Sequence, residues 1–316
     1  MQQTVGRDRW LAGGYFANIN GAYDINYNYS DPATYNPLLQ LPNGASGYLN
    51  FSMHTRAFSA FAQNEFDILP NLTLITGIRY NRNDQSFSAR YHCNEVVSGL
   101  CNSFFAAGGP DSFSSGSLFK LHQSDNEWNG RIGLNYHVIP NIMLWGSITR
   151  GTKAPGFAAP LAGNVTPSQL PFKNETLYAY EGGAKTNWLN HKLTINAGWF
   201  YYDFHNYQAN TFNGVIVSVI NRPATNRGGE LDASYQPIKN LFFNVGVAYA
   251  NFRVKNIQGI TEYPIDAPKY QLNLGVNKIF DLTEDLKMTY TYNMRYTSGR
   301  YYNIVNTAAD YAPGYI

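Results

Sequence analysis

The sequence predicts an all-β protein, a transmembrane antiparallel up-and-down β-barrel, and three observations support this fold class. Five times, a long run of alternating residues ends in a short turn and restarts as a second alternating run. The runs are about ten residues long, as a tilted strand needs to cross a bilayer, whereas strands of soluble sheets have about five or six. Aromatic residues make up 16% of the chain and charged residues only 14%.

Each pair of runs is interpreted as an antiparallel hairpin with a tight turn. The turns are rich in Pro, Asn and Asp, residues that favour turn geometry. They are Pro70–Asn71, Pro140–Asn141, Asn190–His191, Lys239–Asn240 and Asp281–Asp285. The hairpins are Phe61–Leu69 with Leu72–Tyr80, Arg131–Ile139 with Ile142–Thr149, Tyr178–Leu189 with Lys192–Tyr201, Glu230–Ile238 with Leu241–Tyr249, and Tyr270–Phe280 with Leu286–Tyr296.

The alternation predicts which face of each strand meets lipid and which meets water. In Leu286–Tyr296 one set of alternate residues is entirely apolar or aromatic, and the other set is entirely polar. Successive side chains of a strand point to opposite faces, so the apolar set faces lipid and the polar set faces the lumen. The residues that we expect to face the lumen include Gln63, Glu65, Asp67, Arg79, Arg131, Asn135, Glu181, Lys185, Glu230 and Asp232.

The composition excludes other classes. The mean hydropathy of −0.34 is that of a water-soluble protein, and no run of about 18 apolar residues suggests a spanning helix. A membrane-spanning barrel can have this mean hydropathy, because half of the residues in each strand face a water-filled lumen. The 25 tyrosines suit the aromatic girdles at the two interfaces. A net charge of +2 with scattered basic residues argues against nucleic acid as a partner.

The longer connections give the barrel an expected orientation, because outer-membrane barrels have short periplasmic turns and long extracellular loops. We also expect a first, ascending strand at Trp10–Asn26, the top of a descending strand at Phe212–Asn221, and the start of another at Ala312–Ile316. The predicted long loops are Tyr27–His54, Arg82–Lys120, Lys153–Asn174, Asn251–Pro268 and Thr297–Pro313.

The two cysteines, Cys93 and Cys101, lie in a polar, glycine-rich stretch between two strand runs. In an oxidising compartment we expect them to pair and to fix an extracellular loop. Two free thiols, or a metal site with His92, are the alternatives. The metal site lacks further ligands at a suitable spacing, so we predict no metal site.

The segment Met1–Trp10 lacks the basic stretch and apolar core of an export signal. An exported barrel needs such a signal, and an open sheet leaves edge backbone groups unpaired in hydrocarbon. We therefore expect the chain to be a fragment of a longer protein.

Four segments resemble TonB-dependent outer-membrane receptors in the order and spacing of that family. Within them, the residues Arg150-Gly-Thr-Lys-Ala-Pro-Gly-Phe157 resemble a Gly-Phe-Lys-Ala-Pro loop motif, and Gly228-Gly-Glu230 resembles a Gly-Val/Ala-Glu step before a descending strand. The segments are Ala57–Asn81, Trp128–Phe157, Glu175–Gln208 and Asn226–Phe252.

The resemblance implies a barrel of 22 strands, of which this chain would supply about 11–12, roughly strands nine to twenty. It also implies an N-terminal plug domain and a TonB box, both absent here, and a closing strand that ends in an aromatic residue, also absent. We therefore assign residues 1–316 to one barrel domain that is incomplete at both ends. The expected location is the outer membrane of a Gram-negative bacterium.

The resemblance also suggests where contacts would form. Glu65 and Asp67 face inward near the periplasmic end, where a plug would dock. Arg150 and Lys153 lie at the top of a strand in the most family-like motif, where they suit an anionic ligand. Hydration of the lumen wall with cross-strand ion pairs is the alternative for the acids. For the two cations, the alternative is that this start of a loop has a purely structural role.

The function that we expect is uptake of a scarce nutrient, energised by TonB-ExbB-ExbD, with a ferric siderophore as the first hypothesis. The partners would be outer-membrane lipid, the plug and a small ligand such as a ferric chelate. We expect no enzymatic activity and no cofactor, because no catalytic motif is present and the six histidines share no pattern. The alternatives are a passive porin-like channel, or a complete smaller barrel with a structural or enzymatic role.

Overall fold

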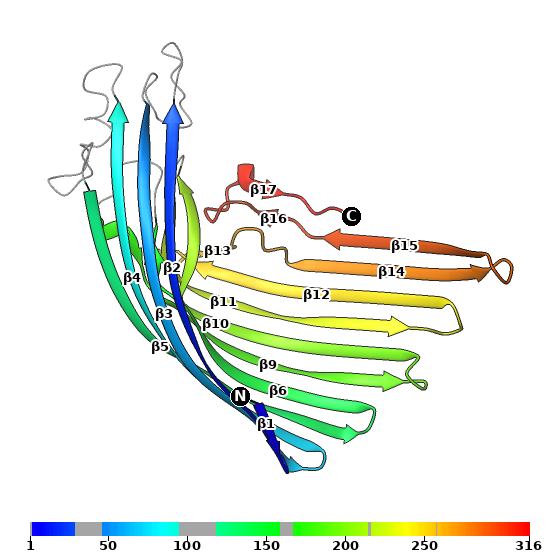
Figure 1. Cartoon of the computed structure of the whole chain (residues 1–316). Coiled ribbons are helices and arrows are strands. Elements are labelled where there is room, and N and C mark those ends of the chain that lie inside the picture. The colour runs from blue at the N-terminus through cyan, green and yellow to red at the C-terminus, as the bar shows by residue number, and fades with distance from the viewer. Residues whose placement is uncertain (1, 29–45, 95–117, 159–166, 214–215, 257) are drawn as a thin grey trace.

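The computed structural model describes residues 2–28, 46–94, 118–158, 167–213, 216–256 and 258–316. Within these ranges the chain is one curved antiparallel sheet (Figure 1) in which long strands follow one another in chain order. The long strands are β2 (Asp8–Asn28), β3 (Ser46–Leu69), β4 (Leu72–Asn94), β5 (Leu118–Ile139), β6 (Ile142–Lys153), β9 (Glu175–Trp188), β10 (Leu193–Asn213), β11 (Ile216–Tyr235), β12 (Leu241–Lys255), β14 (Tyr270–Asp281) and β15 (Lys287–Thr297).

Short elements complete the sheet and the loops. The strand β1 pairs with β2 at one edge and β13 extends β12, while β7–β8 and β16–β17 form two small ribbons of their own. Two single-turn 3₁₀ helices lie in loops. These elements are β1 (Gln2–Val5), β7 (Gly156–Phe157), η1 (Pro167–Gln169), β8 (Pro171–Phe172), β13 (Thr261–Glu262), β16 (Arg300–Tyr301), η2 (Ala308–Asp310) and β17 (Tyr311–Ala312).

The five predicted hairpins are confirmed, as is the number of strands. They correspond to β3–β4, β5–β6, β9–β10, β11–β12 and β14–β15, all antiparallel; the register is continuous except for a one-residue irregularity beside the turns of β3–β4 and β5–β6. Their turns all lie at one end of the sheet, which we call the short-turn end; the opposite end is the long-loop end (Figure 1). The sheet order runs from β1 to β15, and these two edges do not pair with each other within the described residues.

The register confirms the two predicted faces. From β3 to β5, Gln63 is level with Gly77 and Gly77 with Arg131, so these positions share the polar inner face. From β12 to β15, Val245 is level with Leu274 and Leu274 with Met294 on the apolar outer face. Antiparallel partners point to the same side of a sheet. The strand pairing therefore shows which residues of every strand face inward and which face outward.

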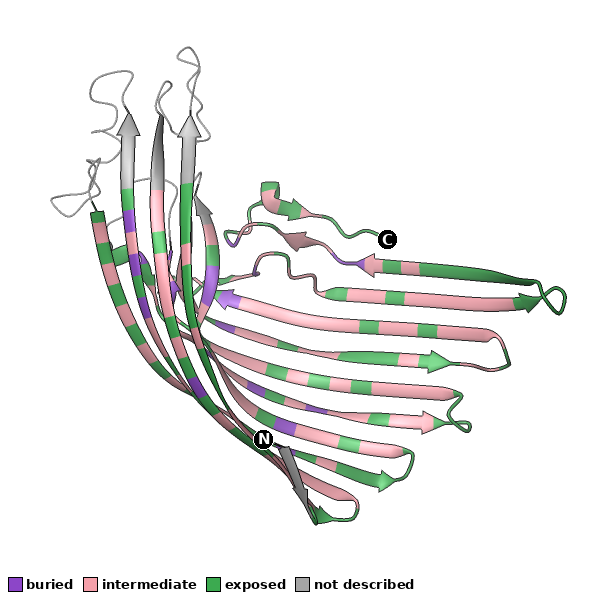
Figure 2. Cartoon of the chain, viewed as in Figure 1, coloured by how far each residue is buried: buried purple, intermediate pink, exposed green. Residues whose placement is uncertain are grey.

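Buried residues gather toward the long-loop end of the sheet (Figure 2). One cluster joins Ala209, Ala224 and Val254 of three neighbouring strands to Ile304 from the loop after β15. The short-turn half has little buried apolar surface of this kind among the described residues, because its inner face is polar and its outer face is open. The core therefore lies where loops fold back on the inner wall.

Two predicted loops are wrong in part, because the strands run further than the alternation indicated. Residues Arg82–Asn94 belong to β4, and the residues from Ser46 to His54 belong to β3, so both lie in strands rather than loops. The apolar-outward alternation on which the prediction relied ends at this level, because the outer face becomes polar and apolar side chains such as Phe51 and Phe87 lie on the inner face. Backbone pairing between β3 and β4 continues without it, as far as Ser46 with Asn94.

The assignment of Phe212–Asn221 to a single descending strand is also wrong. Phe212 and Asn213 end the ascending strand β10, and the descending strand β11 begins at Ile216. At the C-terminal end, only one residue of the strand expected at Ala312–Ile316 pairs with the wall: Tyr315 forms an antiparallel bridge with Thr297 of β15. Among the described residues, no helix is long and apolar enough to span a membrane.

Glycines on neighbouring strands make room for two large rings of β10. Trp199 is level with Gly229 and Phe200 with Gly228, on opposite faces of the sheet. A Cβ at Gly228 would collide with the Tyr249 carbonyl oxygen and lie 2.7 Å from the Phe200 ring. On the other side of β10, a Cβ at Gly182 would lie 2.8 Å from Trp199. The Gly228-Gly-Glu230 motif therefore has a steric reason.

We predict that Gly228→Ala destabilises the barrel by about 1–3 kcal/mol, the usual cost of overpacking. Urea titration of the folded, heat-modifiable band in outer membranes measures the change. Gly77→Ala is the matched control, since its Cβ would lie 3.8 Å from the nearest atom, the Ala62 carbonyl oxygen. Equal midpoints for both variants would refute the steric explanation.

Candidate functional site

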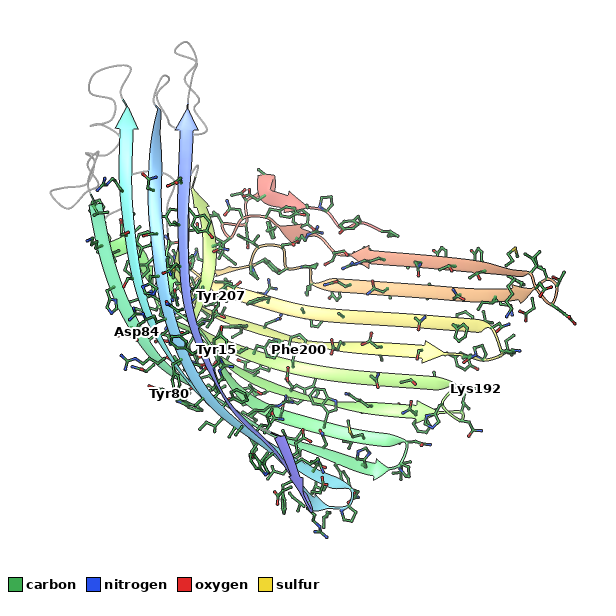
Figure 3. All side chains as sticks on the ribbon, viewed as in Figure 1. Tyr15, Tyr80, Asp84, Lys192, Phe200 and Tyr207 are labelled. Atoms are coloured by element: carbon green, nitrogen blue, oxygen red, sulfur yellow. The ribbon has the colours of Figure 1, made fainter. Side chains whose placement is uncertain are left out.

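A ladder of aromatic rings lines the inner wall along β10. Phe200 stacks on Tyr202 with ring centroids 4.8 Å apart, and Phe204 stacks on Phe252 of β12 at 5.4 Å. Tyr207 meets both Phe204 and Phe252 edge to face. Figure 3 labels Phe200 and Tyr207 on this part of the wall. The rings lead from the middle of the wall to the core cluster at the long-loop end.

A carboxylate fixes the middle of this ladder. The Tyr202 hydroxyl donates to Oε1 of Glu181 over 2.6 Å, and the Ser147 hydroxyl donates to Oε2 over 3.4 Å. These residues come from β10, β9 and β6, so the contact ties three strands on the inner face. Glu181, predicted to face the lumen, does so, and both of its oxygens accept hydrogen bonds.

The connection between β6 and β9 folds inward over neighbouring strands. The Phe157 ring stacks on Phe87 of β4 with centroids 5.2 Å apart. A Cβ at Gly156 would collide with Phe172, whose ring lies over this glycine in the β7–β8 ribbon. Leu170 is 1% exposed. The Pro-Gly-Phe end of the family-like motif therefore anchors this loop inside the wall.

Two side-chain amides hold the two ends of the same loop. The Gln208 side chain, 8% exposed, donates to the carbonyl oxygens of Ala154 and Lys173 over 2.8 and 3.1 Å. Asn221 of β11 accepts from the Lys173 N–H over 2.7 Å and donates to its carbonyl over 3.0 Å. Sequence reasoning missed both residues, since an isolated Gln or Asn in a polar strand end gives no signal.

Two further loops are joined to each other at the long-loop end. The Tyr263 and Tyr301 rings stack at 5.7 Å, and the Asp266 N–H donates to the Tyr301 carbonyl over 2.8 Å. Arg300 pairs with the Asp266 carboxylate. The Arg253 guanidinium of β12 lies 3.8 Å from the Tyr263 ring centroid. The loop residues 258–269 and 298–314 thus form one structured rim.

The structure places the two predicted ligand contacts in different settings. Arg150 is only 13% exposed at its side chain: its Nη2 lies 2.9 Å from Oε2 of Glu127, and its guanidinium lies 4.4 Å from the Trp128 ring centroid. Lys153 is exposed, and its side chain has no ion-pair partner among the described residues. The two cations are therefore not equivalent.

The two predicted plug contacts meet an arginine of this chain. Arg9 of β2 donates to both oxygens of Asp67 over 2.6 and 2.8 Å, and the Thr73 hydroxyl donates to Oδ1 over 2.8 Å. Glu65 accepts one longer bond from Arg9, at 3.4 Å. Asp67 is thus engaged by three donor contacts, whereas Glu65 keeps most of its acceptor capacity.

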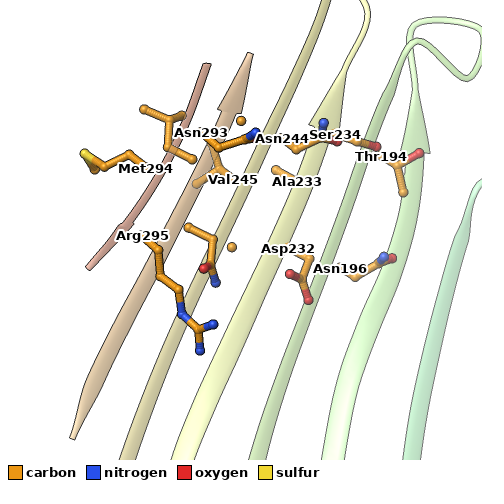
Figure 4. A pocket seen from close by; sticks show the side chains of 14 residues that line it. Thr194, Asn196, Asp232, Ala233, Ser234, Asn244, Val245, Asn293, Met294 and Arg295 are labelled. Atoms are coloured by element: carbon orange, nitrogen blue, oxygen red, sulfur yellow. The ribbon is translucent and has the colours of Figure 1, made fainter. Parts of the chain in front are cut away.

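A polar groove of about 530 Å³ opens on the inner wall toward the short-turn end (Figure 4). The small residues Gly246 and Gly275 leave space that amide, carboxylate and guanidinium side chains surround. These include Asn196, Asp232, Asn244, Asn273, Asn293 and Arg295.

The predicted disulfide lies outside the described residues. Cys101 is in residues 95–117, and only the backbone of Cys93 is described, where it is level with Gly47 at the end of β4. Among the described residues, no group of three His, Cys, Asp or Glu side chains is arranged to hold a metal ion.

The fold and inner wall define a class: part of an antiparallel barrel whose long-loop end is lined by aromatic rings and inward-folded loops. A family model described as TonB dependent receptor-like, beta-barrel matches residues 2–316. The chain belongs to the TonB-dependent receptor family, of whose β-barrel it forms a part.

Solved structures share this fold at low sequence identity. The ferric yersiniabactin uptake receptor FyuA from Yersinia pestis has a TM-score of 0.72 at 15% identity, covering 99% of this chain and 43% of that chain. The ferric-catecholate import receptor Fiu from E. coli K12 has a TM-score of 0.68 at 17% identity, covering 99% of this chain and 45% of that chain. The copper transporter OprC has a TM-score of 0.55 at 13% identity, covering 97% of this chain and 54% of that chain. The chain thus spans about half the length of these proteins or less.

We predict that Gln208→Ala frees the loop between β6 and β9, because the Ala154 and Lys173 carbonyls lose their buried donor. Limited trypsinolysis in outer membranes should then cleave after Lys173 several-fold faster. Asn210→Ala, at an exposed position two residues further on β10, is the control. Unchanged cleavage in the Gln208 variant would contradict the proposed anchoring role.

Proposed function

We propose that this chain forms the barrel wall of a receptor that takes up a scarce nutrient across the outer membrane, with a ferric siderophore as the ligand class. The observation that carries the proposal is the aromatic lining of the long-loop end, from Phe200 to Phe252, beside the inward-folded loop that holds Phe157. Aromatic walls with a few exposed cations suit a flat, anionic metal chelate through stacking and cation–π contacts.

The family and the fold support this proposal. FyuA and Fiu are described as uptake receptors for ferric chelates, and OprC as a copper transporter. Metal ions or their chelates are therefore the first ligands to test. In this proposal the short-turn end faces the periplasm, a plug closes the lumen, and TonB-ExbB-ExbD supplies the energy.

Between the two predicted ligand contacts, we favour Lys153. Arg150 is already neutralised by Glu127 and packed on Trp128, so its charge serves to fix the end of β6. Lys153 lies three residues further, at the start of the inward-folded loop, with its ammonium exposed. It is the cation of this motif that remains free for a ligand carboxylate or phenolate.

We expect Lys153→Gln in the complete receptor to weaken binding of an anionic ferric chelate about tenfold, as lost charge-assisted hydrogen bonds do. Fluorescence titration or uptake of labelled iron measures this. Lys192→Gln, in a turn at the opposite end (Figure 3), removes the same charge and should change nothing. Equal affinity in the two variants would reject Lys153 as a contact. If the receptor takes up copper but not iron, copper would replace the ferric siderophore as the proposed ligand class.

For the plug, we propose Glu65 rather than Asp67 as the contact of this wall. The carboxylate of Asp67 is held by Arg9 and Thr73, whereas Glu65 has room for donors from a docked domain. Glu65→Gln should therefore increase protease cleavage of the plug about tenfold to a hundredfold, the loss expected of one hydrogen bond to a charged group. A plug that stays fully protected would count against this contact.

A passive porin-like channel remains the alternative function. Such a channel has no plug and conducts ions steadily. Conductance of the complete protein in planar bilayers separates the two, since a plugged receptor stays closed and a porin passes current.

A further inference from the structure

Two arginines are close neighbours on the inner wall, between its short-turn and long-loop ends. Arg131 of β5 is level with Gly77 of β4, and Arg79 lies two residues beyond Gly77 on the same face. Diagonal neighbours of this kind have Cα atoms about 7–8 Å apart. Both arginines line a groove of about 310 Å³, which the small residues Gly77, Thr149 and Gly151 leave open to the lumen.

The wall itself does not neutralise these two charges. The Arg79 guanidinium donates to the Ser59 hydroxyl over 2.8 Å and to Oδ1 of Asn81 over 2.6 Å, and both acceptors are uncharged. The Arg131 side chain is exposed, and it forms no hydrogen bond or ion pair in the part of the chain that the structure describes. Arg9 on the same face is, by contrast, paired with two carboxylates. The groove therefore holds two positive charges, and no carboxylate lines it.

Two lysines extend this positive charge along the inner face. Lys153 lies four residues beyond Thr149, the partner of Arg131, which is about 14 Å toward the long-loop end. Lys185 is level with Met143, six residues from Thr149 and about 20 Å toward the short-turn end. Even spacings keep these positions on one face. Both lysines are exposed and lack ion-pair partners among the described residues, so unpaired cations follow one another down one side of the lumen.

Such a row of like charges in a polar passage favours an anion. Walls of low dielectric constant concentrate the field of the charges and raise the local concentration of counter-ions. Arginine binds carboxylate or phosphate oxygens through parallel charge-assisted hydrogen bonds, and two arginines at this spacing can hold one anionic group from both sides. The Phe61 ring, 6.0 Å from the Arg79 guanidinium, adds an aromatic surface beside them.

We propose that Arg79 and Arg131 form an anion-binding site in the lumen, which holds the anionic oxygens of the imported ligand on its way to the periplasm. Lys153 precedes this site on the inward path, and Lys185 follows it. The site rests on the proposed uptake function, since it needs a ligand that enters the lumen. It selects a cargo that keeps a net negative charge over a neutral one.

Phenylglyoxal, which modifies accessible guanidinium groups, tests this site in the complete receptor purified in detergent. Peptide mass spectrometry measures the modification of Arg79 and Arg131 without an anion, with inorganic phosphate, and with ferric dihydroxybenzoate, an anionic chelate. We expect both arginines to react without an anion and both probes to protect them. Arg131→Gln should raise the probe concentration that half-protects Arg79 about tenfold, the loss expected of one charge-assisted hydrogen bond.

Lys287→Gln is the control, because it removes an inward-facing charge on β15 and should leave the protection of Arg79 unchanged. Arginines that do not react without an anion would overturn the proposal, since a plug would then already cover them. Reaction that neither probe slows, or an equal change in the control, would also overturn it. Protection by phosphate alone would support the anion site and reject the ferric ligand class. The heat-modifiable band of each variant shows that the barrel is folded.

Discussion

The continuous antiparallel pairing of the backbone from β2 to β15 is the constraint on which the rest of this structure depends. A lipid bilayer offers no hydrogen-bond partners, so each spanning strand must pair with both neighbours. The pairing fixes register, and register fixes which side chains face inward, since a slip of one residue would exchange the faces. Both the aromatic ladder of the inner wall and the apolar outer face follow from it.

Within this frame, glycine and aromatic residues occur together for a steric reason. Trp199 and Phe200 project to opposite faces of β10, and Gly182 of β9 and Gly228 of β11 give the two rings room against the sheet. Phe200 begins the ladder that leads to the buried cluster around Val254. A motif that the sequence shows only as a family likeness is therefore part of how the inner wall is packed.

The sequence predicted the hairpins and faces because they depend on local alternation, which water on one side and lipid on the other impose. It did not predict how far β3 and β4 extend, because toward the long-loop end the outer face becomes polar and apolar side chains such as Phe51 and Phe87 lie on the inner face, so the apolar-outward pattern ends. The loop contacts could not be predicted from the sequence either. Phe157 meets Phe87, and Gln208 meets Lys173, across distances in sequence that periodicity cannot report. For the same reason, the partner of Arg150, Glu127 on β5, was not foreseen.

The face assignment is the central claim, and single cysteines along β15 test it most directly. In the complete receptor in membranes, cysteines at Thr289, Thr291 and Asn293 should react with a water-soluble, membrane-impermeant maleimide that enters the lumen from the open side. Cysteines at Tyr290, Tyr292 and Met294 should instead respond to a lipid-soluble quencher. A two-residue alternation in this sense confirms the account. Uniform reactivity along β15, or the opposite alternation, would contradict it.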